Sequence, residues 1–274
     1  MLFDTHCHIS DKQYDDTRDA LIEEIRASQV QFLMDVGTDL ASSRRVVETA
    51  RSLEFCYAII GCFPSDTYTF DEDQLAQIKA LAADPKVRAI GEIGLDYHYE
   101  DTDRKTQQHW FARQIETALE LKLPIAIHSR EADQDTMDIL KACGAFSKER
   151  AACFPLQPDG KPDARVLLHC FSGSAELGRQ YVELGATLSI CGPVTFKNAR
   201  KTVEVVEQTD LLHLVTETDS PYLTPVPFRG KQNKPVYVEY TARKIAEIKG
   251  ISYEEVCSAT FQNACRFFGI QNER

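Results

Sequence analysis

Short apolar runs alternate with longer amphipathic segments along the whole chain. The apolar runs predict strands that begin near residues 1, 32, 56, 87, 124, 165, 187 and 211. Between and after these runs, apolar residues recur with helical spacing, which predicts helices over residues 17–28, 39–53, 71–84, 104–122, 174–185, 199–209, 237–250 and 252–269. The last two segments end on Gly250 and Gly269, and glycine is the residue that most often follows the last turn of a helix.

Strands that alternate with helix-length segments are typical of βα units and of a parallel sheet. The chain has 274 residues, no internal repeat and no change of composition along its length. We therefore expect an α/β fold, a (β/α)8 TIM barrel, with residues 1–274 forming a single domain. Pro, Gly and Asp mark two long surface loops, over residues 141–164 before the sixth strand and 220–235 after the eighth.

Charge and cysteine content narrow the classes of function. The chain has 31 basic and 42 acidic residues and a net charge of −11, which argues against a broad basic face for duplex DNA. A small phosphate-containing substrate at a cationic metal site stays compatible with this charge. The nine cysteines include no CxxC pair and are expected to be reduced, as in a cytoplasmic protein. Neither a signal peptide nor a membrane span is expected.

Metal-binding side chains stand where five of the predicted strands end. His6 and His8, in the motif DTHCH, are two residues apart in the first strand, so their side chains point the same way. Four further strand ends carry one such residue each: Glu92, His128, His169 and Asp219. Barrel active sites are built at the carboxyl ends of the strands, and imidazole and carboxylate are the ordinary ligands of divalent metals. The sequence therefore predicts a metal centre at this end of the barrel.

Each of these residues taken alone has a structural explanation. An HxH pair is more often two surface histidines than a metal site, and a single strand histidine is more often a hydrogen-bonded core residue. A lone glutamate is often an ion-pair partner. The coincidence of five strands favours the metal centre. The other three histidines are left out of it, because His109 lies in a predicted helix, His213 lies early in the last strand, and nothing places His98.

Six candidate ligands exceed what a site with one metal needs, so we expect two divalent metals, of which Zn, Mg and Mn all suit the ligand set. Glu92, near the barrel centre, is the expected bridge between them. The two histidines of the first strand and Asp219 are expected to hold one metal, and His128 and His169 the other. The water between the metals would act as a hydroxide nucleophile, with Asp219 orienting it and serving as base. Glu217 is expected to orient a ligand histidine.

Seven motifs, in order and across nearly the whole chain, resemble the TatD family of metal-dependent deoxyribonucleases, within the wider group of amidohydrolase-like barrels. They are FDTHCH, AIGEIGLDYH, PIAIHSREA, LLHCFSGS, FKNARK, ETDSPYL and RGKQNKP. The resemblance implies a TIM barrel, a two-metal site and hydrolysis of DNA phosphodiester bonds. It also implies, motif by motif, the same six metal ligands that the strand ends predict.

One motif departs from the family. After the third strand the family usually reads Gly-x-His-Pro-His, where this chain has Phe63 and Ser65 in place of the two histidines. A role of those histidines in substrate binding or proton transfer therefore does not carry over. The loop over residues 141–164 is also extra relative to the family pattern. Both features are compatible with a shifted substrate.

Basic and polar residues near the strand ends are candidates for binding phosphate oxygens. They are Arg130, Lys197, Arg229, Lys231 and Asn233. The structural alternative for each is a solvated charged loop. Ser172 and Gly173, after His169, are weaker candidates for backbone or hydroxyl contacts.

The leading hypothesis is a hydrolase of DNA, acting on ends or single strands, with no obligate protein partner. A second hypothesis keeps the metals but changes the substrate to an ester or amide, such as an aminoacyl-tRNA, because the same hydroxide attacks carbonyl carbon. A third is a barrel that has lost activity and only binds a ligand.

Overall fold

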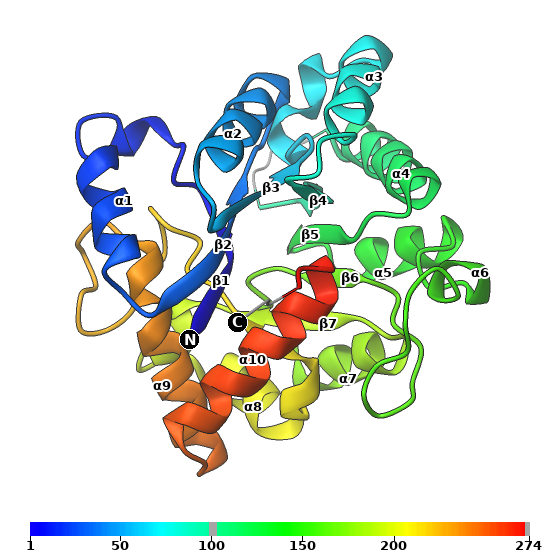
Figure 1. Ribbon diagram of the computed structural model, residues 1–274. Coiled ribbons are helices and arrows are strands. Elements are labelled where there is room, and N and C mark those ends of the chain that lie inside the picture. Colours follow the sequence, from blue (N-terminus) through cyan, green and yellow to red (C-terminus); the bar gives the residue numbers. More distant parts are fainter. Residues whose placement is uncertain (99–102, 272–274) are drawn as a thin grey trace.

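The computed structural model describes residues 1–98 and 103–271, and eight parallel strands form the centre of the fold (Figure 1). The strands are β1 (Leu2–Cys7), β2 (Val30–Val36), β3 (Cys56–Ile60), β4 (Val87–Asp96), β5 (Ile125–Arg130), β6 (Val166–Leu168), β7 (Thr187–Ile190) and β8 (Leu214–Thr216). Each strand pairs in parallel with the next, in the order of the chain.

Side-chain hydrogen bonds join β8 to β1. Thr5 Oγ1 donates to the carbonyl oxygen of Thr216 at 3.1 Å, and Thr218 Oγ1 donates to Asp4 Oδ2 at 2.5 Å. Beyond the strands, the amide of Asp219 donates to the carbonyl oxygen of His6 at 2.9 Å. The sheet is thereby a nearly closed TIM barrel, as predicted.

Helices surround the sheet (Figure 1). They are α1 (Arg18–Arg26), α2 (Leu40–Ser52), α3 (Glu72–Leu81), α4 (Arg104–Leu121), α5 (Asp133–Ala142), α6 (Lys148–Ala151), α7 (Ala175–Glu183), α8 (Arg200–Gln208), α9 (Val238–Lys249) and α10 (Tyr253–Phe268). Short 3-10 helices are η1 (Lys12–Tyr14), η2 (Pro64–Thr69), η3 (Gly192–Thr195), η4 (Leu211–His213) and η5 (Pro235–Tyr237). No helix in the described residues is both long and apolar enough to cross a membrane.

Local signals explain where several helices begin and end. Asp39 and Ser252 form capping boxes at the first turns of α2 and α10, in which their side chains accept a backbone N–H that the helix leaves unpaired. Gly250 and Gly269 end α9 and α10 in the left-handed conformation, as the sequence predicts.

The structure corrects the prediction at three points. The predicted last strand begins with η4 instead, because the side chain of Asp210 accepts from the amide of Leu212 and turns the chain before β8. The predicted loop 141–164 includes the end of α5 and all of α6. Ser147 caps α6, and the buried side chain of Arg150 donates to the carbonyl oxygens of Leu123 and Ala164. Glu92 lies in the middle of β4 rather than at its end, because β4 continues to Asp96.

The inside of the barrel is apolar at the end where the strands begin. One cluster joins inward-facing residues of β1 to β6 and β8 with the apolar face of α10. Figure 1 shows α10 running across this end of the barrel, close to both chain termini. A larger cluster fills the space between the strands and the surrounding helices. The opposite end of the barrel interior is the one that carries polar side chains.

Candidate metal centre

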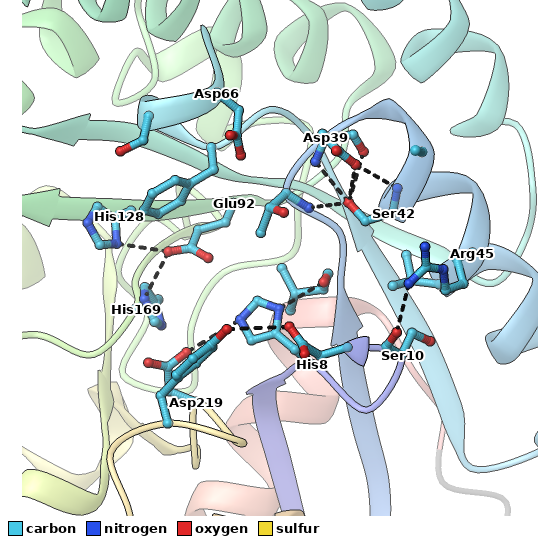
Figure 2. A pocket seen from close by; sticks show the side chains of 18 of the residues that line it. His8, Ser10, Asp39, Ser42, Arg45, Asp66, Glu92, His128, His169 and Asp219 are labelled. Carbon is cyan, nitrogen blue, oxygen red and sulfur yellow. Dashed lines mark hydrogen bonds and ion pairs between the residues drawn. The ribbon is translucent and has the colours of Figure 1, made fainter. Parts of the chain in front are cut away.

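The six predicted ligand residues converge at the carboxyl ends of the strands. They are His6 in β1, His8 just after it, Glu92 in β4, His128 in β5, His169 just after β6, and Asp219 beyond β8. Figure 2 shows the labelled side chains of this set gathered around the wall of one pocket. His6 is fully buried and Glu92 is 4% exposed.

Glu92 lies between two groups of imidazoles. Its Oε1 is 2.8 Å from His128 Nδ1 and 3.2 Å from His169 Nε2. Its Oε2 is 3.3 Å from His6 Nε2. Glycine at position 94 permits this approach of β4 to β5, because a Cβ at Gly94 would lie 1.9 Å from the carbonyl oxygen of His128. One carboxylate is therefore shared by histidines from three strands or strand ends.

Asp219 lies on the β1 side of the centre. Its Oδ1 is 3.4 Å from His8 Nε2 and 3.9 Å from His6 Nε2. The backbone holds this arrangement, because the amide of His8 donates to the carbonyl oxygen of Ser220 at 2.8 Å. The side chain of Asp219 is 16% exposed, so it is accessible from the pocket.

Groups outside the six fix the orientation of the imidazoles. His8 Nδ1 donates to the carbonyl oxygen of Val36 at 2.9 Å. His169 Nδ1 donates to Glu217 Oε1 at 3.0 Å, which is the arrangement expected of Glu217. Such partners set the ring orientation and tautomer of a ligand histidine.

Sequence reasoning missed one member of this outer set. His128 Nε2 lies 3.3 Å from Asp96 Oδ2, at the end of β4. The signal was present in the motif GEIGLD, which places a second carboxylate four residues after Glu92. Because β4 continues past Glu92, this second carboxylate stands at the actual end of the strand.

The ionisation of these groups follows from burial and from their neighbours. Burial disfavours the charged form of His8, but the hydrogen bond and charge of Asp219 outweigh it and raise its pKa to about 9. Burial and the nearby His169 lower the pKa of His6. Burial also disfavours the charge of Glu92, yet the surrounding imidazoles hold its pKa well below the usual range. The carboxylate is therefore charged, and the centre favours a cation.

The residues fit a metal on independent grounds. Both ring nitrogens of His6 are buried without a hydrogen-bond partner among the described residues, although buried polar atoms are normally paired. Two of the clusters of potential ligand atoms share Glu92: one has His6 and His8, the other His128 and His169. Within each cluster the three atoms lie within 4.8 Å of one another. Imidazole nitrogen and carboxylate oxygen suit Zn, Mn and related divalent ions.

The centre opens into a cavity of about 700 Å³. Lys12, Arg45 and Arg130 line it, so three cationic side chains face the region above the metal-binding residues. Phe63 and Ser65 line it too, and the Phe63 ring lies 4.7 Å from the His128 ring, edge to face. An apolar ring thus occupies the position where the family pattern has its first histidine.

Of the predicted substrate contacts, only Arg130 lines this cavity. Lys197 lines a separate hollow beside α8, and Arg229 stacks over Phe196 with 4.3 Å between guanidinium and ring centre. Lys231 is exposed and lies 5.7 Å from the ring centre of Phe228.

Asn233 has a structural role in the fold. It is fully buried, and its amide donates to the carbonyl oxygens of Thr218 and Tyr222. It therefore holds the 220–235 loop against the segment that carries Asp219. The three remaining histidines also lie away from the centre: His213 is buried 3.7 Å from Asp159, His98 contacts Glu131, and His109 is exposed on α4.

Comparison with known proteins agrees with this arrangement. A model of the family described as TatD related DNase matches residues 3–269. YabD of Bacillus subtilis strain 168, described as an uncharacterized metal-dependent hydrolase, is 43% identical over 98% of this chain and 100% of its own length. YcfH of Escherichia coli K12, described in the same words, is 32% identical over 100% of this chain and 97% of its own length. The crystal structure of YjjV, a TatD homolog from Escherichia coli K12, matches with a TM-score of 0.87 at 25% identity and covers 98% of both chains.

Proposed function

The chain belongs to the TatD family of metal-dependent hydrolases, and from this we propose that it hydrolyses DNA phosphodiester bonds with two divalent cations, at ends or in single strands. The observation that carries the proposal is the sharing of Glu92 by two groups of imidazoles at the base of one cavity. A carboxylate in this position would be able to serve two cations, with the imidazoles on either side of it as their further ligands.

The six side chains divide into two ligand sets around that bridge. His6, His8 and Asp219 would hold one cation, and His128 and His169 the other. When bound, the cations supply Lewis acidity for the phosphate and lower the pKa of a water between them. Glu217 and Asp96 keep the rings of His169 and His128 in orientation through the contacts described above.

Asp219 takes the role of general base. Both carboxylates line the cavity, but the side chain of Asp219 is 16% exposed, whereas that of Glu92 is 5% exposed and has imidazoles on both of its oxygens. A water that attacks the phosphorus from the cavity transfers a proton to Asp219. The scissile P–O bond then breaks, and the leaving oxygen of the other strand fragment takes up that proton, which restores the carboxylate. A correctly placed base of this kind contributes about 10²–10⁴-fold to the rate.

The surroundings of the centre suit a strand end. A volume of about 700 Å³ is that of a small-molecule site, so it accommodates a terminal nucleotide and not a duplex. Lys12, Arg45 and Arg130 are placed to pair with backbone phosphates, which gives binding without base specificity. The net charge of −11 leaves little attraction for long duplex DNA elsewhere on the surface.

The test is a cleavage assay on metal-stripped protein. DNA labelled at either end, single-stranded and as a blunt duplex, is incubated with Mg²⁺, Mn²⁺ or Zn²⁺ restored one at a time. We expect stepwise shortening of the single strand from one end, in the presence of metal only. Asp219→Asn should abolish shortening, and His109→Gln, on the exposed face of α4, is the matched control that should not.

Bound metal is measured in the same samples. Two equivalents of Mn²⁺ per chain, an ion that thiol ligands bind weakly, with metal-dependent shortening support both parts of the proposal. Two equivalents without cleavage of any DNA would overturn the substrate but not the centre, and ester and amide substrates, including aminoacyl-tRNA, would be tried next. Fewer than one equivalent, with no gain on adding metal, would overturn the centre itself.

A further inference from the structure

A second cluster of metal-binding side chains lies behind His169, on the side away from Glu92. Cys170 follows shortly after β6, Cys191 directly follows β7, and Glu217 directly follows β8. Three neighbouring strands thus each contribute one residue to the cluster. None of these three residues lines the cavity above the metal centre.

The three side chains are close enough to bind one ion. Both sulfur atoms and one carboxylate oxygen of Glu217 lie within 4.8 Å of one another. Cys191 is 3% exposed and Glu217 is fully buried, whereas Cys170 is partly exposed, so the cluster can be reached from its Cys170 side. All nine cysteines are free thiols, and within the described residues this cluster alone brings two of them together with a carboxylate.

Glu217 supplies an independent indication that a ligand is expected. Its Oε1 accepts from His169 Nδ1 and from the amide of Cys170. Its Oε2 is buried and has no hydrogen-bond partner in the described part of the chain. Glu217 lies between two candidate ligand clusters, because one of its oxygens is within 4.8 Å of ring nitrogens of His6 and His169 and one is within 4.8 Å of the two sulfur atoms. A buried carboxylate oxygen without a partner is costly, since both the charge and the lone pairs go unsatisfied.

We propose that Cys170, Cys191 and Glu217 form a separate binding site for one thiophilic divalent cation such as Zn²⁺. Two sulfur ligands and one oxygen ligand prefer Zn²⁺ to the hard ions Mg²⁺ and Mn²⁺. The hydrolytic centre offers only nitrogen and oxygen ligands, so Mg²⁺ and Mn²⁺ suit that centre alone, whereas Zn²⁺ suits both sites. With three protein ligands, a tetrahedral ion would keep its fourth coordination position open for water or another ligand.

The two sites are connected through a single carboxylate. One oxygen of Glu217 accepts a hydrogen bond from His169 Nδ1, and a cation bound beside Cys170 would be coordinated by the same carboxylate. A cation bound by Cys170, Cys191 and Glu217 (the thiol site) therefore restricts the orientation of the Glu217 carboxylate. It thereby restricts the orientation of the His169 ring as well. The proposed site does not depend on which substrate the hydrolytic centre accepts.

The experiment uses Cd²⁺ as the probe, because thiolate-to-cadmium charge transfer absorbs in the ultraviolet and histidine and carboxylate ligands give no such band. The full chain is reduced, freed of reductant, loaded with Mn²⁺ and titrated with Cd²⁺. We expect the band to rise to a plateau at one equivalent of thiolate-bound Cd²⁺ per chain. Cys170→Ser and Cys191→Ser should each lose at least half of it. Serine keeps the size of the side chain at both positions.

Controls separate this site from other thiols and from misfolding. Cys153→Ser removes an exposed thiol on the surface and should leave the band unchanged. X-ray absorption at the zinc edge should show sulfur at about 2.3 Å in the wild type, and this contribution should fall in Cys191→Ser.

Three results would overturn the proposal. One is a band that is as strong in Cys170→Ser and Cys191→Ser as in the wild type. Another is a band that Cys153→Ser removes. The third is a reduced wild-type protein that binds no thiolate-coordinated Cd²⁺, including the case in which the two thiols are found only as a disulfide. Each result is read independently of DNA cleavage.

Discussion

The two ends of the barrel interior differ in the polarity of their side chains. Where the strands begin, Phe3, Met34 and Ile59 meet Phe267 and Phe268 of α10 in a closed apolar cluster. Where the strands end, the same strands and their neighbours present imidazoles and carboxylates around Glu92. The apolar end is covered by a helix, and the polar end opens into the cavity.

This difference assigns the stability of the fold mainly to the apolar end and its chemistry to the polar end. The apolar end contributes burial and packing, which are insensitive to the identity of any one polar group. The polar end contains buried carboxylates and imidazoles, and their arrangement favours binding of a cation over stability of the metal-free protein. Substitutions at the two ends are therefore expected to have separable effects, and the following variants test that expectation in order of decreasing size.

Glu92→Gln should have the largest effect. Glutamine keeps the volume of the side chain but removes the charge that both groups of imidazoles share. Loss of metal-assisted charge stabilisation is worth several kcal/mol, so we expect a decrease in hydrolysis on the order of 10³-fold or more. Bound metal should fall in parallel. The metal-free variant should still unfold in one cooperative transition, and loss of that transition would show that the polar end also maintains the fold.

Phe267→Ala is the counterpart at the apolar end. The side chain is fully buried, and its ring lies 4.9 Å from that of Phe268. Truncation should lower the free energy of unfolding by about 3–5 kcal/mol, measured by urea denaturation. The turnover per folded molecule and the bound metal should stay at the wild-type level. Phe267→Leu should show a smaller loss, and an equal fall in turnover would contradict the separation of the two ends.

The polar end was largely predictable because parallel strands bring their carboxyl ends to one edge. His6, His8 and Asp219 could be grouped from strand ends alone, without knowledge of any distance. Asp96 is missed if β4 is ended at Glu92, although the motif contains it, because β4 runs past Glu92 with a shift of register between Ile90 and Ile93. The extra residues of β4 bring a second carboxylate beside His128.

The loops were less predictable because their side chains bind partners that are distant in sequence. Asn233 looked like a phosphate ligand on a basic loop, but it donates to carbonyl oxygens of Thr218 and Tyr222 and is buried. Arg229 stacks on Phe196 but stays exposed, so its phosphate contact remains a prediction. Composition identifies such a loop, whereas the tertiary contacts decide which of its side chains remain free to bind.

Glu217→Gln should have an intermediate effect at the polar end. Glutamine can still accept a hydrogen bond from His169 Nδ1, but it loses the charge that makes the ring a stronger ligand. We expect metal affinity at the hydrolytic centre to fall about 10–100-fold, measured by competition with a chelator. Activity should return at high metal concentration. A loss that added metal does not restore would mean that Glu217 does more than orient the histidine.

Arg45→Gln should have the smallest effect, because Arg45 lies on the cavity wall and contacts none of the ligand side chains. Its Nη1 donates to the carbonyl oxygen of Ser10 at 3.2 Å, which holds the guanidinium beside the cavity. Binding a substrate phosphate there stabilises ground and transition states alike, so KM should rise several-fold while kcat stays constant.

Arg44→Gln is the matched control for this variant. Arg44 is the preceding residue of α2, is exposed, donates to Gln77 and does not line the cavity. Both variants remove one positive charge from the same helix turn, so a general change in surface charge would affect them equally. A rise in KM in Arg45→Gln alone, with a weaker salt dependence, would locate the phosphate at the cavity wall. Equal changes would instead mean that α2 acts only through its overall charge, and the boundary of the polar end would then lie at the metal-binding residues themselves.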